Sequence, residues 1–376
     1  MRGTIRKLKR KEPTWEVRVD LPVGVGGKRR MKSVSVRGTK RDADMRLRAL
    51  LSSLDKGLSP DSSKGTTSQF LDWWLQNYVL PNVRPRTSER YASDIRLHIA
   101  PVIGGTRLAN LRADDAQTVL STMLDKGYSR KSVRHCYRVM RMAFKHAVEK
   151  GIVQVNVTDS VNPPKLEPTE LELPRLEQVQ HILELAASTP YAPVLNFLIR
   201  TGCRRGEALG LEWRHVDLEH GTVSIVQSLQ RIGRTGLRFV PPKSAKSRRS
   251  VALDEDTVEM LRAHHGGQIL VMAQLGTTYE DNGLVFPGPI GKPLDPATLT
   301  RNFEKLVMRT MMGRFRLHDL RHFHASMLLK AGVHLKVVQE RLGHSSIAIT
   351  ADTYSHVAPS LQRDAADVFS RYMQKM

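Results

Sequence analysis

Apolar and polar positions alternate with two different periods along the chain. Between Trp15 and Leu21 every second residue is apolar, which is the period of a half-buried strand, and Val34 and Val36 repeat it. Thr39 is then placed to cap a helix, whose apolar face consists of Leu47, Leu50, Leu51 and Leu54. This stretch predicts a small module of three strands and a helix, residues 1–57.

A polar linker follows, and apolar residues then recur every three or four positions. This period predicts a helical bundle over residues 66–157. A proline-rich segment, 157–174, separates the bundle from a third part, 172–376. The third part begins with helices, continues with strands near 222–226, 237–240 and 250–253, and returns to helices. The predicted fold is therefore multidomain and mainly α with small β-sheets: a sheet-plus-helix module, a helical bundle and an α+β domain.

The charge of the chain narrows the possible partners. It has 59 Lys+Arg against 37 Asp+Glu in 376 residues, a formal net charge of +22, and no apolar run long enough to span a membrane. Half of the excess lies in residues 1–60, with 17 basic and 6 acidic residues. A polyanion is the expected partner, and nucleic acid fits better than a membrane. The two cysteines exclude a disulfide scaffold and suit the cytoplasm.

Several basic residues are candidate DNA contacts. The outward positions of the first strands suit a groove-binding sheet face, and one predicted helix carries a basic stripe. The alternative for both is a solvated basic surface. The candidates are Arg18, Lys28, Arg29, Arg30, Lys32, Arg134, Arg138 and Arg141.

Two cationic positions stand where helices or strands end. Arg204 follows Gly202, which breaks a helix, so that its side chain is able to reach a phosphate. Lys243 lies in PPKSAKSRRS, at the predicted tip between two strands, where a flexible ammonium is able to extend into a DNA groove. Lys246 in the same segment is an equally placed alternative. Taken singly, each is also explained as surface charge.

The segment His318-Asp-Leu-Arg321-His322 places two histidines four residues apart, as in zinc proteases. Asp replaces the usual Glu, and the arginine opposes a metal, so phosphate binding is favoured over zinc. Downstream, His344 follows Gly343 in LGHSS, where a helix start is able to bind anions, and Tyr354 lies ten residues further on.

Together these residues resemble the tyrosine recombinases of the phage-integrase type. The resemblance rests on TGCRRGE, PPKSAKSRR, HDLRH, LGHSS and the late Tyr354, in this order and spacing. The segment TSERYASDIRLHIAPVIG is similar to the core DNA-binding domain of that family, and residues 1–57 resemble its arm-type DNA-binding module.

The resemblance implies a site-specific DNA recombinase, an integrase that integrates or excises a mobile element. Tyr354 would be the nucleophile and would form a 3′-phosphotyrosyl link. Arg204 and Arg321 would hold the phosphate, Lys243 would be the general acid, and His318 and His344 would assist. Glu207 and His322 would support them.

The implied partners are double-stranded attachment-site DNA with core-type and arm-type sequences, three further copies of the chain in a tetramer, and DNA-bending and directionality factors. No cofactor, metal or membrane is implied, and the expected location is the cytoplasm of a bacterial host, at the nucleoid. Two alternatives stay open: a type IB topoisomerase-like enzyme, and a DNA-binding protein with a recombinase fold and no activity.

Overall fold

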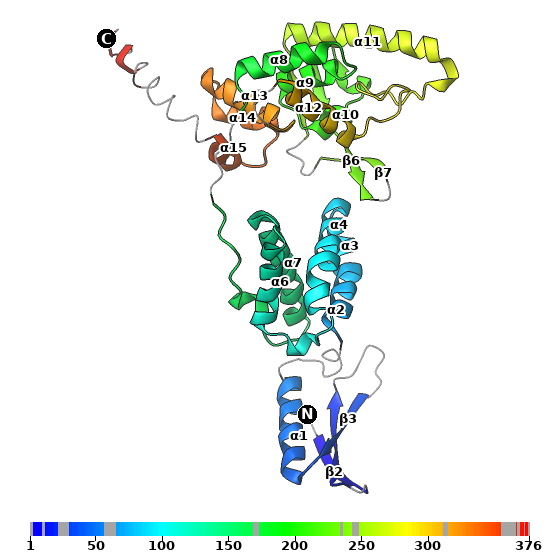
Figure 1. Ribbon diagram of the computed structural model, residues 1–376, viewed down its shortest axis with the longest axis vertical. Helices are drawn as coiled ribbons and strands as arrows, with labels where there is room; N and C mark the ends of the chain where they lie inside the picture. The colour runs from blue at the N-terminus through cyan, green and yellow to red at the C-terminus, as the bar shows by residue number, and fades with distance from the viewer. Residues whose placement is uncertain are drawn as a thin grey trace. The chain divides into compact units, whose positions relative to one another are not determined.

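The computed structural model divides the chain into two compact units, residues 1–168 and 169–376 (Figure 1). In the part that the structure describes, helices dominate both units and the strands form small antiparallel sheets. The predicted fold class is confirmed. None of the described helices is long and apolar enough to cross a membrane. The described residues are 3–9, 12–21, 30–55, 65–167, 173–233, 236–242, 248–310, 315–354, 366, 369–371 and 373–374.

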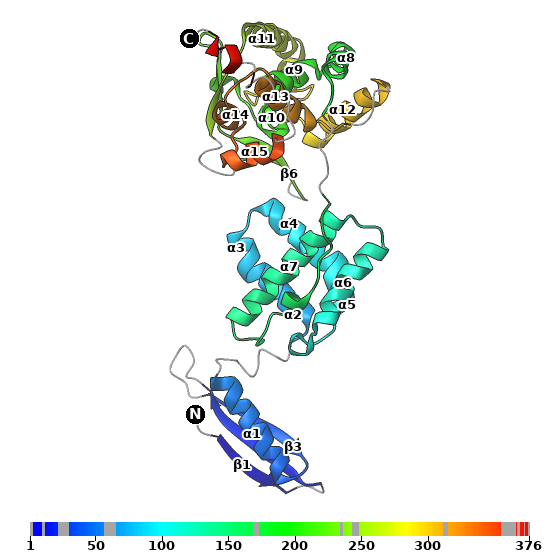
Figure 2. The ribbon, with the colours of Figure 1, turned by 90° about the vertical axis from the view of Figure 1, so that its left-hand side faces the viewer.

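The first unit begins with an antiparallel sheet in the order β1-β2-β3, followed by one helix. Val17 and Val19 of the middle strand are buried with Ala43 and Leu50 of the helix, so α1 covers one face of the sheet (Figure 2). As predicted, Thr39 caps the helix, because its Oγ1 accepts a hydrogen bond from the Asp42 main-chain N–H, at 3.3 Å. The elements are β1 (Gly3–Leu8), β2 (Thr14–Leu21), β3 (Arg30–Arg37) and α1 (Lys40–Asp55).

The rest of this unit is helical and has its own core, which includes the fully buried Trp74, Met140 and Phe144. Its helices are α2 (Thr67–Trp74), α3 (Leu80–Asn82), α4 (Pro85–Asp94), α5 (Ala100–Ile103), α6 (Ala113–Asp125) and α7 (Arg130–Glu149). Short 3-10 segments, η4 (Leu108–Asn110) and η5 (Val157–Ser160), join and follow them.

Two of these helices continue through a wider π turn that ends next to a proline. The π segments are η2 (Leu75–Val79), before Pro81, and η3 (Ile95–Ile99), before Pro101. A proline in a helix has no N–H and clashes with the carbonyl four residues earlier. The π turn relaxes this clash, because the N–H before each proline bonds the carbonyl five residues back.

The second unit combines two small sheets with helices. One sheet has the order β4-β5-β8 and the other pairs β6 with β7. The strands are β4 (Val216–Asp217), β5 (Thr222–Ile225), β6 (Ser228–Ile232), β7 (Gly236–Val240) and β8 (Arg249–Ala252). The helices are α8 (Leu176–Ala187), α9 (Ala192–Thr201), α10 (Arg205–Leu209), α11 (Glu255–Leu275), α12 (Pro296–Thr310), α13 (Asp319–Lys330), α14 (Leu335–Leu342) and α15 (Ile347–Tyr354), with 3-10 segments η6 (Trp213–His215) and η9 (Gly276–Thr278).

One prediction about these strands is wrong. The basic segment PPKSAKSRR was expected to be the tip between two paired strands. Instead, β7 pairs with β6, and β8 pairs with β5, so the segment joins two different sheets. Pro241 and Pro242 follow β7 directly, and because proline lacks the N–H that a ladder needs, pairing ends there.

Candidate active site

Arg321 lies between the C-terminal ends of two helices. Its Nη1 donates to the Gly202 carbonyl at 2.7 Å and its Nη2 donates to the Leu342 carbonyl at 2.6 Å. Helices α9 and α14 both end at a glycine in the left-handed region, Gly202 at φ +64° and Gly343 at φ +66°. The last carbonyls of a helix have no partner within it, so a cation between two helix ends satisfies them and is itself held in place. Arg321 is only 3% exposed.

Burial lowers the pKa of Arg321 without removing its charge at neutral pH. Desolvation, and then the neighbouring charge of Arg204, lower the pKa of Arg321 to about 9. The side chain therefore stays protonated at neutral pH. A guanidinium has five N–H donors, and the two described bonds to carbonyls occupy two of them.

Arg204 is held by the first turn of α10. The Arg204 main-chain N–H donates to Glu207 Oε2 at 2.9 Å, and its side-chain Nη1 donates to Glu207 Oε1 at 2.8 Å. Its Nη2 reaches the Gly343 carbonyl at 3.5 Å. The Arg204 side chain is 39% exposed, whereas that of Glu207 is only 6% exposed. Glu207 therefore holds Arg204 from the buried side.

Glu207 has a second cationic partner, Arg249, which the sequence did not single out. Arg249 Nη2 donates to Glu207 Oε2 at 2.8 Å and approaches Cys203 Sγ at 3.8 Å. Desolvation alone would raise the pKa of Glu207, but the charges of Arg249 and Arg204 overcome it and lower that pKa to about 2. Burial raises the pKa of the Cys203 thiol. The carboxylate is thus ionised and the thiol neutral at pH 7.

His318 and His322 stand at the start of α13. Their rings are 5.0 Å apart between centroids and nearly perpendicular. Desolvation lowers the pKa of His318 to about 4, with further contributions from the charges of His322, Arg321 and Arg204. Both causes have the same sign, and they keep His318 neutral at pH 7.

His344 lies between α14 and α15. Its Nδ1 is 2.9 Å from Thr350 Oγ1, and its carbonyl accepts a hydrogen bond from Gln339 Nε2 at 2.6 Å. Desolvation and then the charges of Arg321 and Arg204 lower the pKa of His344 to about 4. The same two arginines therefore act on both His318 and His344, which brings four of the predicted residues into one site.

The remaining predicted residues are less fully described. Tyr354 is the last residue of α15, one helical turn after the buried Thr350. Lys243 and Lys246 lie outside the described residues, so the choice between them stays open. Within the described chain, no cluster of three or more His, Cys, Asp or Glu residues is arranged to hold a metal ion.

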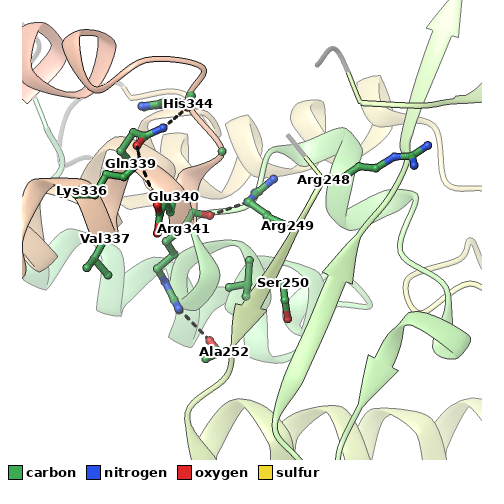
Figure 3. A pocket seen from close by; sticks show the side chains of 12 residues that line it. Arg248, Arg249, Ser250, Ala252, Lys336, Val337, Gln339, Glu340, Arg341 and His344 are labelled. Carbon is green, nitrogen blue, oxygen red and sulfur yellow. Dashed lines mark hydrogen bonds and ion pairs between the residues drawn. The ribbon is translucent and has the colours of Figure 1, made fainter. Parts of the chain in front are cut away.

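A cavity of about 610 Å³ adjoins this site between β8 and α14. Figure 3 shows Arg249 pointing toward the end of α14, whereas its neighbour Arg248 extends in the opposite direction. Its lining includes Gly343 and His344, together with Lys336 and Glu340 of α14.

This arrangement agrees with comparisons to known proteins. Residues 172–360, half of the chain, match the phage integrase family. The chain belongs to the phage integrase family. Residues 66–124 also match the N-terminal SAM-like domain of phage integrases. The resemblance to tyrosine recombinases of the phage-integrase type is thereby confirmed.

Individual relatives are distant but extend over most of the chain. A tyrosine recombinase XerC-like protein of Caldanaerobacter subterraneus subsp. tengcongensis is 26% identical over 351 residues, 88% of this chain and 90% of that protein. An integrase of Streptomyces ambofaciens is 27% identical over 370 residues, 94% of this chain and 92% of its own. The integrase of transposon Tn1549, solved with a circular-intermediate DNA, is similar in fold, with a TM-score of 0.67 and 19% identity over 80% of this chain and 99% of that one.

The candidate DNA-contacting residues of the N-terminal sheet differ in exposure and in the face of the sheet on which they lie. Arg18 is on the sheet face away from α1, 3.0 Å from Glu16 in an ion pair. Lys32 is opposite Val19 in the β2–β3 register and is only 9% exposed, so it lies on the face that α1 covers. Lys32 is therefore not on the outward face where the strand pattern placed it. Lys28 and Arg29 lie outside the described residues, and the Arg30 side chain is not described.

The basic stripe of α7 is partly engaged by the segment that follows it. Arg134 Nη1 donates to the Pro164 carbonyl at 3.3 Å, and Arg141 Nη2 is 3.3 Å from Asp159 Oδ1. Arg138, between them, is exposed. Two of the three stripe residues therefore hold the chain that leaves the helical bundle, an interaction that helical periodicity does not reveal.

Proposed function

We propose that this protein is a site-specific DNA recombinase that integrates or excises a mobile element, with Tyr354 as its nucleophile. The observation that carries the proposal is the convergence of Arg204, Arg321, His318 and His344 on one site. These residues come from separate stretches of the chain, and the two arginines lower the pKa of both histidines. The site thus concentrates positive charge and neutral hydrogen-bonding rings, which suits a phosphodiester.

The chemistry follows from these groups. Tyr354 Oη attacks the scissile phosphorus, the P–O5′ bond breaks, and a 3′-phosphotyrosyl link forms while Lys243 protonates the departing 5′ oxygen. A 5′-hydroxyl from another strand later attacks the same phosphorus and releases the tyrosine. Covalent catalysis divides the exchange into two displacements and conserves the bond energy. A general acid contributes roughly 10²–10⁴-fold to such a step.

The two arginines hold the non-bridging oxygens as charge grows on them. Arg321 is fixed by two main-chain carbonyls and Arg204 by Glu207, so neither has to reorganise when DNA binds. His318 assists proton transfer, and His344 donates to the phosphate. Both rings are neutral at pH 7, so each is able to carry a donor and an acceptor nitrogen.

The other parts of the chain bind the DNA around this site. We assign residues 66–157 to the core-type sequence, residues 1–57 to an arm-type sequence and residues 172–376 to catalysis. Four copies act on two duplexes, assisted by DNA-bending and directionality factors. The reaction takes place on bacterial chromosomal DNA, which places the protein at the nucleoid.

The test begins with the target. Sequencing the chromosomal junctions of the element that encodes the chain defines the two attachment sites. Purified protein is then incubated with a plasmid that carries both sites. Recombinant circles are the expected product. Relaxation of a supercoiled plasmid without the sites, and no recombinants from the plasmid with them, would favour the topoisomerase-like alternative.

A further inference from the structure

Resting on the proposed function, we propose that Arg249 is a positioning residue that holds Arg204 and the His344 loop in the geometry that catalysis needs. Arg249 is the first residue of β8, and its hydrogen bonds join three elements that are distant in sequence: β8, the first turn of α10 and the end of α14. It touches neither DNA nor the reacting atoms in this role, and it acts through Glu207 and Gly343.

The first interaction is a shared carboxylate. Glu207 Oε2 accepts from Arg249 Nη2 at 2.8 Å, and Glu207 Oε1 accepts from Arg204 Nη1 at 2.8 Å. The Arg249 and Glu207 side chains are each 6% exposed, whereas Arg204 is 39% exposed. The buried ion pair of Arg249 and Glu207 thus holds the more accessible Arg204 in place. A buried carboxylate with one partner removed is costly, so removal of Arg249 should loosen Glu207.

The second interaction is with the turn that presents His344. Arg249 Nε donates to the Arg341 carbonyl at 2.7 Å. A Cβ atom added at Gly343 would lie 3.0 Å from Arg249 Nη1 and 3.1 Å from its Cδ, so the guanidinium lies against the bare Gly343 backbone. The Gly343 carbonyl is in turn 3.5 Å from Arg204 Nη2. Arg249 and Arg204 therefore both lie against the residue directly before His344.

Only an arginine supplies both interactions at once. A guanidinium is planar and directs its Nε and Nη donors along fixed, different directions, whereas a lysine ammonium is a single point charge. A lysine at this position is able to neutralise Glu207 or to reach the Arg341 carbonyl. It is not expected to do both.

The experiment compares Arg249→Ala and Arg249→Lys with wild type on a nicked suicide duplex built from the mapped core site. Arg262→Ala is the matched control, because Arg262 also donates to a carbonyl, that of Leu218 at 2.9 Å, but is exposed on α11. Single-turnover formation of the covalent adduct and the Kd for the core site are measured, with thermal unfolding as the check on folding.

We expect Arg249→Ala to lower the adduct rate by roughly 10–100-fold, the usual decrease when a residue that orients a site is removed. The Kd should change by less than about threefold, and Arg262→Ala should behave as wild type. Arg249→Lys should fold as wild type does and form the adduct about tenfold more slowly. This variant keeps the test decisive if the alanine variant does not fold. A wild-type rate for a folded Arg249→Lys or Arg249→Ala would overturn the inference, whereas no adduct from wild type would overturn the proposed function.

A double variant isolates the route through Glu207. If Arg249 acts by positioning that carboxylate, Arg249→Ala should cost much less in a Glu207→Gln background than in wild type. Arg249 is the main charge that lowers the pKa of Glu207, so this pKa should rise in Arg249→Ala. As the pH is lowered, the adduct rate of the single variant should therefore begin to fall at a higher pH than that of wild type. Fully additive effects and an unchanged acid limb would indicate a merely structural arginine.

Discussion

At the scale of single residues, neighbouring protein groups fix the arginines of the candidate site. Arg321 is held by two helix-end carbonyls, Arg204 by Glu207, and Glu207 by Arg249. Each of these guanidinium groups is therefore held in one orientation, which the conformational entropy of a long side chain would otherwise disfavour. In this kind of catalysis, prior orientation of donors toward developing charge usually contributes more to the rate than any other single effect.

Arg321→Lys tests that view. One ammonium is not expected to bridge the carbonyls of Gly202 and Leu342 and also hold a phosphate oxygen, so the adduct rate should fall by about 10²–10³-fold. DNA affinity, measured by fluorescence anisotropy, should change far less. A decrease in affinity as large as the decrease in rate would mean that Arg321 serves ground-state binding instead.

Acidification should destabilise the protein. His324 is buried, its Nδ1 lies 2.9 Å from the Ile199 carbonyl, and desolvation and then the Arg341 charge lower its pKa from 6.5 to about 4. Below pH 6.5 the unfolded chain therefore binds protons that the folded chain does not, so stability falls as the pH drops from about 6.5 toward 4. The pKa of His344 is lowered in the same direction.

The measurement is the thermal unfolding midpoint of the full chain between pH 7.5 and 4.5. We expect it to fall with pH, and to fall less steeply in His324→Asn, whose amide is able to donate to the same carbonyl but does not titrate. A midpoint that is constant over this range, or an equal slope in the variant, would contradict the assigned pKa shift of His324.

Local sequence was sufficient for some of these residues and not for others. Arg204, His318, Arg321 and His344 stand in short motifs or beside helix-ending glycines, so each was a candidate from the sequence, and the family resemblance grouped them in one site. Arg249 looked like one more cation in a basic loop. Its partners Glu207 and Arg341 are 42 and 92 residues away, and pairing at such distances has no signature in the sequence.

At the scale of elements, a side chain of α15 contacts the candidate site. Thr350 is fully buried, and its Oγ1 lies 2.9 Å from His344 Nδ1, one turn before position 354. This bond therefore links the loop between α14 and α15 to the helix that carries the proposed nucleophile.

Thr350→Val should remove that bond while keeping the shape of the side chain. A buried hydrogen bond contributes about 0.5–1.5 kcal/mol net to stability, so the unfolding midpoint should fall slightly and the adduct rate by up to about tenfold. Thr350→Ser, which keeps the hydroxyl, is the control and should retain most of the rate. Equal rates in wild type and Thr350→Val would show that the bond does not guide catalysis.

Element types were largely predictable, and strand partners were not. The alternation at Trp15–Leu21 became β2, and the Thr39 cap began α1 as expected. The pairing of β7 with β6 was missed, because the two apolar residues of β6, Leu229 and Ile232, stand three positions apart and do not show the period of a strand. The π turns before Pro81 and Pro101 were also missed, since a proline marks a break without indicating how the helix adapts.

At the scale of the whole molecule, the net charge of +22 is unevenly distributed. Its N-terminal share is carried partly by the sheet face away from α1, where Arg6, Arg18 and Arg37 are exposed. Each cation that binds a phosphate releases counterions, so this face should make binding to arm-type DNA depend on salt.

Replacing Arg6, Arg18 and Arg37 together by Ser should therefore weaken binding to arm-type DNA and flatten its salt dependence. The slope of log K against log salt should decrease by up to about 0.9 for each phosphate that the variant no longer neutralises. Core-site binding and adduct formation on a core-only duplex should stay near wild type. An unchanged slope would mean that other residues of the chain bind the arm-type DNA.

Covalent attachment of Tyr354 to DNA is the central step of the proposed reaction. Wild type and Tyr354→Phe are incubated with the nicked core-site duplex, digested with trypsin and nuclease, and analysed by mass spectrometry for a nucleotide-modified peptide. We expect a 3′-phosphonucleotide on the peptide that contains Tyr354 in wild type, and no adduct in Tyr354→Phe despite equal DNA binding. An adduct on any other residue, or one that persists in Tyr354→Phe, would contradict the assignment of Tyr354 as the nucleophile.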